Sequence, residues 1–322
     1  MTKKKTTRTK KADPAVAATT AAAPVAATAA AAPVAALAET SAFANHPGFS
    51  KAVRVFQIYF RPDQLHQLEP EFIPYDNALG DFSMLEYAVF RKLYNSDLTR
   101  DCDYWGAVSW RFREKAMINA GDLYGVIAAN PGYDLYFMNP EPQIEGLYEN
   151  LWVQGSTAHP NFLPLVEQLF DAVGMDKRIV SAYRHTRIMA AANYFVGSRK
   201  FWDSYITFIE DFLAKAEKNA PPALLAALKN TNADPRNLHA GANYFPFIIE
   251  RLLTEFIIQQ AGKLSCFKIE LTNKKARLPA YAHDLEWLKN QALERKDEKL
   301  LRIWANYRNL YFKTLYGNQA KG

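Results

Sequence analysis

Asp103-Tyr-Trp-Gly-Ala-Val-Ser-Trp-Arg-Phe-Arg113 is the segment from which the fold class of this chain can be inferred. It begins with an acidic turn, continues as an aromatic-rich run typical of a buried strand, and ends in two arginines. We expect a strand over 104–112 with Arg111 and Arg113 on one face, because side chains two apart on a strand point the same way. Paired guanidinium groups suit a diphosphate, although arginines on an exposed sheet face are equally ordinary.

Strands and helices alternate on both sides of this segment. The residues predict strands at 53–60 and 133–138 and helices at 82–94 and 122–130. Such alternation indicates an α/β domain with a mostly parallel sheet in the N-terminal half. Ligands of these sheets bind at the carboxyl ends of the strands, so we expect one rim to hold Arg111, Arg113, Asn139 and Glu141.

The second half of the chain is predicted to be rich in helices. Apolar stripes indicate helices at 161–174, 177–190, 199–218, 245–261 and 283–316, with one late strand at 265–271. We divide the chain into a basic Ala/Pro/Thr-rich arm (1–45), which we expect to be disordered, an α/β domain (46–282) and a C-terminal helical extension (283–322).

The net charge of +6 over 322 residues is concentrated in the arm. Six Lys or Arg and two acids fall before residue 46, which leaves only +2 for the remaining chain. We therefore expect no specific nucleic-acid partner, with DNA association through the arm and a signal peptide as alternatives.

No stretch has the roughly 20 apolar residues of a membrane span. Cys102 and Cys266 have no metal or disulfide spacing and indicate ordinary thiols in a reducing compartment.

Several polar residues in apolar surroundings are candidate site residues. Glu86 lies four residues after Phe82 in an apolar stripe, where a carboxylate must find a partner or shift its pKa. We expect Glu86 to meet the two arginines at one concave rim. A structural ion pair, or a helix turned so that Glu86 lies at its edge, is the alternative.

Three further candidates lie in the second half. His159 sits in a loop beside aromatic residues, where it could contact sugar or phosphate. Asn193 could orient a substrate hydroxyl or simply bind neighbouring backbone. Glu250 borders an apolar stripe and could act as a general base, or it could form a solvated pair with Arg251.

The sequence leaves metal binding open. Asp101-Cys-Asp103 has the acidic spacing of many divalent-cation sites but precedes its strand rather than following it. Asn139 and Glu141 offer hard oxygen ligands after the next strand. Both segments also fit plain turns, so we assign no metal ligand and leave Mg²⁺ or Mn²⁺ as an open cofactor.

These segments together resemble the bacterial capsular-polysaccharide glycosyltransferases with a GT-A-like nucleotide-sugar fold. That family carries Asp-Tyr-(Ile/Val)-Gly running into His-Tyr-Arg-Arg-Tyr. In the same order as the family, this chain has Leu85-Glu-Tyr87, Asp103-Tyr-Trp-Gly106 into Trp110-Arg-Phe-Arg113, Tyr133-Asp-Leu135, Asn193-Tyr-Phe195 and Pro246-Phe-Ile-Ile-Glu-Arg-Leu-Leu253. It departs from the family where Ser109 replaces the histidine and where Phe112 separates the two arginines.

The resemblance implies transfer of a sugar from a nucleotide-sugar donor to a bacterial surface glycan or a lipid-linked glycan. Arg111 and Arg113 would stabilise the diphosphate and Glu250 would be the catalytic base. The substrate-binding residues would be Asp76, Asn77, Glu86, Asp103, His159, Asn193 and Arg251. We expect a cytoplasmic protein, either free or peripheral at the inner membrane. The alternative is a non-catalytic glycan-binding or assembly-scaffold protein on the same fold.

The 283–316 segment has two interpretations. Its aromatic residues alternate with cations, including Trp304, Tyr311, Arg302 and Lys313. The pattern is typical of a helix that docks its aromatic side chains into a core. It also fits a helix that rests on an anionic membrane surface.

Overall fold

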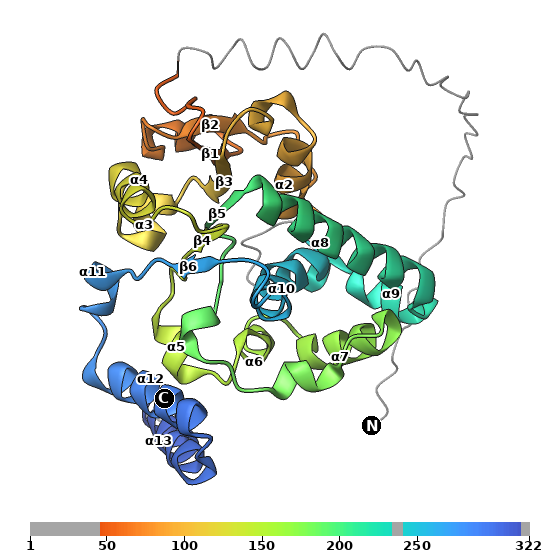
Figure 1. Ribbon diagram of the computed structural model, residues 1–322. Helices are drawn as coiled ribbons and strands as arrows, with labels where there is room; N and C mark the ends of the chain where they lie inside the picture. The colour runs from red at the N-terminus through yellow and green to blue at the C-terminus, as the bar shows by residue number, and fades with distance from the viewer. Residues whose placement is uncertain (1–45, 234–240, 317–322) are drawn as a thin grey trace, which may run out of the picture.

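The computed structural model describes residues 46–233 and 241–316, so the predicted arm lies outside the described residues. Within them the chain builds a six-stranded sheet of order β2-β1-β3-β5-β4-β6 (Figure 1). The strands are β1 (Val53–Tyr59), β2 (Ile73–Asp76), β3 (Tyr104–Ser109), β4 (Leu135–Phe137), β5 (Phe195–Ser198) and β6 (Cys266–Lys268). β5 runs antiparallel to both of its neighbours, and the other strand pairs are parallel. The mixed, mostly parallel α/β prediction is confirmed, but β5 and β6 come from the second half of the chain.

Helices cover both faces of the sheet (Figure 1). α3 (Phe112–Ala116) and α4 (Ala120–Ala129) lie on one face, and their apolar side chains form a core with Val55 and Val108. The larger core on the other face is built by α2 (Glu86–Tyr94), α8 (Arg199–Asn219) and α10 (Phe245–Gln259). At its centre the rings of Trp105 and Trp202 stack at 3.7 Å, and the Trp202 indole N–H donates to the Trp105 carbonyl.

Further helices complete the described part of the chain before residue 280. They are α5 (Gln143–Leu147), α6 (Leu151–Ser156), α7 (Phe162–Val173), α9 (Pro222–Leu228) and α11 (Thr272–Lys275). α7, α8, α10 and β6 confirm the predictions at 161–174, 199–218, 245–261 and 265–271. The helix predicted at 177–190 is wrong, since this segment forms only the 3-10 turns η3 (Lys177–Ser181) and η4 (Thr186–Ile188). The Asn150 amide donates to the carbonyls of Val180 and Ala182, which an α-helix would need for its own bonds.

The C-terminal segment is a helical hairpin rather than the single helix that the sequence predicts. α12 (Ala280–Arg295) ends at Lys296, whose positive φ of 53° breaks the helix, and α13 (Glu298–Tyr316) turns back along it. Trp304 is fully buried and its indole N–H donates to the Gly146 carbonyl, which confirms that this aromatic residue docks into the core. The predicted domain division at residue 283 falls inside α12.

The strand expected over 104–112 ends early, and this changes the position of both arginines. Gln57 on β1 donates to the carbonyls of Ser109 and Trp110, where the chain leaves the sheet. Arg111 is then the N-cap residue of α3 and Arg113 lies within that helix. The prediction that they share a strand face is therefore wrong.

The helix that carries Glu86 also begins later than predicted. α2 starts at Glu86 itself, and Phe82 stays outside the helix, partly exposed and packed edge-on against Phe60. Glu86 is thus half-buried at a helix start instead of lying within a buried stripe. Within 46–233 and 241–316, no helix combines the length and the apolarity that crossing a membrane requires.

Candidate functional site

The carboxyl ends of the parallel strands mark the candidate site. The chain passes from β1 outward to β2 and then returns past β1 to β3, which gives the order β2-β1-β3. The connection that follows β1 therefore runs toward one side of the sheet and the connection that follows β3 runs toward the other, which makes this a topological switch point. Open α/β sheets bind ligands at such a switch point, outside the strand ends. Tyr59, Asp76 and Ser109 end the three strands at this edge.

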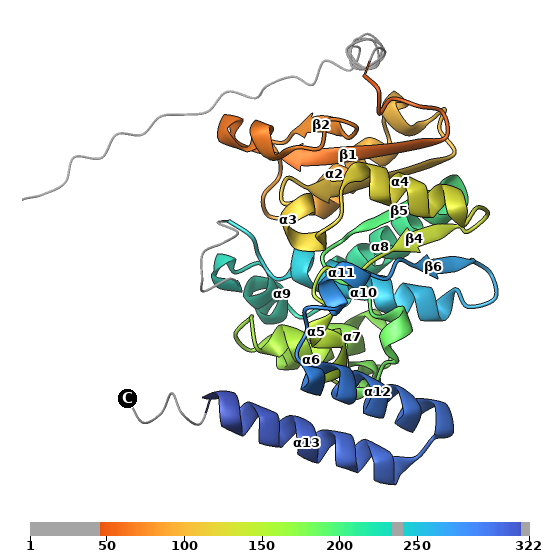
Figure 2. The same ribbon diagram turned by 90° about the vertical axis from the view of Figure 1, so that its left-hand side faces the viewer.

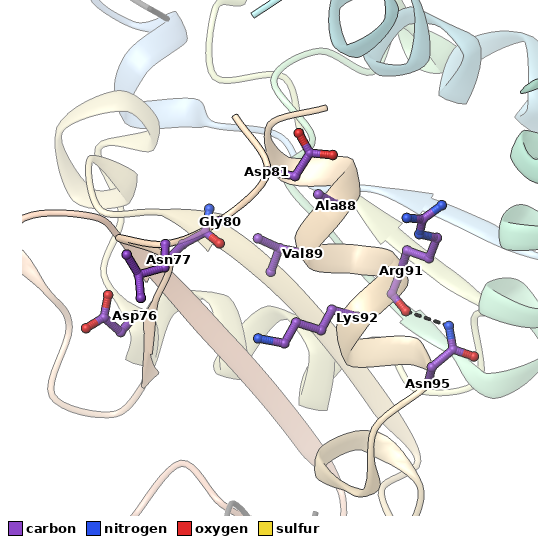
Figure 3. A pocket seen from close by; sticks show the side chains of 10 residues that line it. Asp76, Asn77, Gly80, Asp81, Ala88, Val89, Arg91, Lys92 and Asn95 are labelled. Atoms are coloured by element: carbon purple, nitrogen blue, oxygen red, sulfur yellow. Dashed lines mark hydrogen bonds between the residues drawn. The ribbon is translucent and has the colours of Figure 1, made fainter. Parts of the chain in front are cut away.

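A first cavity of about 450 Å³ lies between the end of β2 and α2. Asp76 and Asn77 form one wall, and Lys92 extends from α2 toward the loop that carries them (Figure 3). The Asp76 carboxylate accepts the Ala78 N–H at 2.9 Å, which fixes the loop. The cavity also presents Arg91 and Asp81, so it offers donors and acceptors of both charges. Asp76 and Asn77 thus lie at the carboxyl end of β2, a strand that the sequence patterns do not predict.

A second cavity of about 420 Å³ lies between residues 66–69 and the start of α3. Both arginines line it, but their partners differ. Arg111 pairs with Glu114, and both side chains are largely exposed. Arg113 binds the carboxylate of Glu69 through two bonds of 2.5 and 2.8 Å, and Glu69 is only 1% exposed. Arg113 compensates a buried charge, whereas Arg111 can exchange its exposed partner for a ligand anion.

The hydroxyls of Ser109 and Tyr194 connect the end of β3 to the segment before β5. They lie 2.7 Å apart, and Tyr194 is 2% exposed. Burial raises the pKa of the Tyr194 phenol, and the charges of Glu86 and Arg111 also act on it, in opposite senses. Arg111 and Arg113 line the same cavity, but Glu86 is not part of its lining and pairs with neither arginine among the described residues, so the expected meeting of all three groups is not found.

A strained turn precedes Tyr194. Ala192 and Asn193 both have positive φ angles, 63° and 54°, which are rare for residues other than glycine and concentrate at functional sites. Glu250 accepts the Ala192 N–H at 3.0 Å and so holds the turn from α10. Asn193 is 6% exposed, and its side-chain oxygen has no hydrogen-bond partner among the described residues.

Arg251 belongs to the core and not to a solvated pair with Glu250, which corrects the prediction. It is 4% exposed and donates to the Leu151 and Phe247 carbonyls and to the Gln154 side chain. Burial lowers the pKa of its guanidinium. These bonds join α10 to α6, so Arg251 has a structural role, while Glu250 stays partly exposed.

Two other predicted residues lie away from the strand ends. His159 is 6% exposed, its Nδ1 lies 2.8 Å from the Ala233 carbonyl, and its ring stacks on Phe247. Asp103 precedes β3, at the amino edge of the sheet, where it lines a mainly apolar cavity with Tyr104 and Tyr136. We therefore exclude His159 and Asp103 from the site.

Two of the candidate metal ligands, Asp101 and Asn139, have side chains engaged in other contacts. Asp101 pairs with the buried Arg54 at 2.6 Å, while Glu141 donates its N–H to Asn139 in a turn, and Asn139 binds Glu145. Among the described residues, no cluster of three His, Cys, Asp or Glu side chains could hold a metal ion. We derive no chemical step through a metal.

The two cysteines are free and half-buried. Burial raises the pKa of Cys102 and of Cys266 to about 11. Since the thiolate is the reactive form, neither thiol is suited to act as a nucleophile.

Sequence reasoning missed two parts of this site. It passed over Tyr194, although this residue follows Asn193 directly, and treated Ser109 only as a departure from a motif. It also missed Lys92, whose position six residues after Glu86 gives no sign that α2 forms a cavity wall.

Comparisons with known proteins add one distant likeness. No family model matches the chain, and no curated protein does. Among solved structures the chain is similar to the apo structure of the WbbM bifunctional glycosyltransferase, with a TM-score of 0.38 and 14% sequence identity. The match covers 68% of this chain and 45% of that one, so it spans less than half of the solved protein. We base the functional assignment on the residues and not on this likeness.

Proposed function

We propose that this protein is a glycosyltransferase that moves a sugar from a nucleotide-sugar donor to a bacterial surface glycan or lipid-linked glycan. One observation carries the proposal: three segments far apart in the sequence, which together carry the family resemblance, meet at the carboxyl edge of the sheet. Ser109 binds Tyr194 at 2.7 Å, and Glu250 binds Ala192 at 3.0 Å. The GT-A-like fold and the capsule-type family are part of the same proposal.

In this proposal each site residue has a separate role in binding the donor. The cavity with Asp76 and Asn77 would take the nucleoside, since carboxylate and amide groups can bind a ribose diol and a base edge. Arg111 would leave Glu114 to bind the diphosphate. Asn193 would accept a hydrogen bond from a sugar hydroxyl.

The reaction then needs a base and a stabilised leaving group. The bond between the sugar anomeric carbon and the diphosphate oxygen breaks, and the acceptor oxygen bonds to that carbon. The acceptor proton passes to Glu250, and the electron pair leaves with the nucleoside diphosphate, whose charge Arg111 stabilises. Arg113 and Arg251 contribute only through the fold.

Titration calorimetry with UDP, GDP and their sugar conjugates tests the proposal, with and without Mn²⁺. We expect wild-type protein to bind one nucleotide class and Arg111→Gln to bind it at least about tenfold more weakly, as lost charge-assisted bonds imply. Arg178→Gln is the matched control, because Arg178 is 88% exposed and pairs only locally with Asp176. Absence of nucleotide binding by wild-type protein would overturn the proposal.

A non-catalytic glycan-binding or scaffold protein is the second candidate. It is favoured by Ser109 standing in place of the family's histidine and by both arginines already having carboxylate partners. This candidate predicts glycan binding that does not depend on nucleotide, and no transfer with any donor.

A further inference from the structure

The outward side of α13 carries a stripe that the fold does not use. Lys299, Ile303, Asn306, Leu310 and Lys313, here called the outer stripe, follow one another at intervals of four and three residues. This spacing puts them on one side of the helix. All five are exposed, and Ile303 and Leu310 remain 54% and 62% exposed. The two aliphatic residues lie in the middle of the stripe, with a lysine at each end.

The other side of α13 fixes which way the stripe points. Trp304 is fully buried against Gly146, the ring of Tyr311 stacks on Tyr281 of α12 at 3.8 Å, and Arg308 pairs with Glu149. In Figure 2, α13 lies beyond α12 at the end of the molecule that is farthest from the sheet. The outer stripe therefore faces away from the body.

Two partners are considered for the outer stripe, a second copy of this chain and a lipid bilayer surface, and the charges of the stripe distinguish between them. A second copy paired by twofold symmetry would have to put its own stripe against this one. An antiparallel pairing centred on Asn306 brings Lys299 of one copy to Lys313 of the other, and a parallel pairing brings each lysine to itself. Both arrangements oppose like charges at both ends of the contact, which destabilises them.

An anionic bilayer surface fits the same features. Lys299 and Lys313 can extend their stems past the aliphatic centre and keep their ammonium groups among anionic headgroups. Arg302, exposed beside Ile303, adds a third cation, against one exposed carboxylate, Glu298, on this side of the helix. We propose that the outer stripe of α13 docks the protein peripherally on the surface of an anionic lipid bilayer, independently of the proposed catalytic function.

Vesicle co-sedimentation of the full chain tests the proposal, using phosphatidylcholine vesicles with and without phosphatidylglycerol. We expect binding only to the anionic vesicles. The double variants Lys299→Glu/Lys313→Glu and Ile303→Ser/Leu310→Ser should each bind at least about tenfold more weakly, given the contribution of each basic or apolar group near a bilayer. Because the changed side chains are exposed, circular dichroism should show unchanged thermal unfolding.

A matched control separates the stripe from general charge. Lys215→Glu/Lys218→Glu makes the same charge change on exposed positions of α8 and should leave binding within about twofold, because α8 has no aliphatic stripe at these positions. Equal loss in this control, or unchanged binding by both stripe variants, would show that the Lys-rich arm or net charge binds the vesicles and would overturn the proposal. So would sedimentation velocity that shows a dimer abolished by Ile303→Ser/Leu310→Ser.

Discussion

The hydroxyl groups of Ser109 and Tyr194 join two antiparallel strands beyond their last backbone pair. β3 and β5 pair from Tyr104 opposite Ser198 to Gly106 opposite Val196, and the side-chain bond of 2.7 Å holds them together further along. This bond keeps the carboxyl end of β3 against the turn that Glu250 holds from α10.

Tyr194→Phe should lower the free energy of unfolding by about 1 kcal/mol, because it removes one buried hydrogen bond and leaves the Ser109 hydroxyl without its partner. Ser109→Ala should cost a similar amount, and the double variant little more than either single one. Urea denaturation of the four proteins measures the coupling energy. If the two single effects simply add, the bond does not contribute as described.

Glu250→Gln separates the charge of this residue from its hydrogen bond. The glutamine carbonyl can still accept the Ala192 N–H, so we expect the free energy of unfolding to stay within about 0.5 kcal/mol of the wild-type value. Sugar transfer should fall about 10²- to 10⁴-fold, since the amide cannot take the acceptor proton. Initial rates at saturating donor measure this effect. Full activity in Glu250→Gln would remove the base from the mechanism.

Arg111 and Arg113 should respond differently to truncation, although they are two residues apart. Arg113→Ala leaves the Glu69 carboxylate buried without its cation and should cost about 1–3 kcal/mol in unfolding free energy. Arg111→Ala breaks an exposed pair and should cost under about 1 kcal/mol. Glu69→Gln in the Arg113→Ala background should recover part of the loss. Equal costs for the two arginines in urea denaturation would contradict this assignment.

Lys289 should make stability depend on pH. Burial lowers the pKa of its ammonium group to about 7, against the opposing charges of Glu145, Glu149 and Glu286. In the unfolded chain the pKa is near 10.4, so between about pH 7 and pH 9 the unfolded state binds more protons at this position. Stability therefore gains on the order of 1–3 kcal/mol from this residue as the pH rises through that window.

Lys289→Met isolates this contribution. Urea denaturation at several pH values should give a shallower rise with pH for the variant than for the wild-type protein. Parallel pH profiles would show that Lys289 keeps an ordinary pKa in the folded state.

Sequence reasoning succeeded where the determining pattern is local. The helices α8 and α10 follow from continuous apolar stripes, and β1 from a run of β-branched and aromatic residues. The sequence also singles out Asp76 and Asn77 as substrate-binding candidates, but it does not predict β2, the short strand that brings them to the strand-end rim.

The errors arise where a distant side chain sets the local structure. The end of β3 depends on Gln57 of the neighbouring strand, and the loss of the helix at 177–190 depends on Asn150. The sequence predicts a solvated pair of Arg251 with Glu250, but Arg251 donates to the Leu151 carbonyl, which lies 100 positions away in the sequence. Spacing along one segment cannot reveal such partners.

The pairing of β4 with β6 bears on how the chain is synthesised. Asp134 and Ser265, where these strands begin to align, are 131 positions apart, and the antiparallel β5 also arrives well after β4. During synthesis on the ribosome, β4 emerges well before either strand with which it pairs. Such non-local pairing slows folding and leaves strand edges unpaired in the meantime. A nascent chain stopped before residue 266 would expose an unpaired edge of β4, so this protein is a candidate client for chaperones that shield β-strands during translation.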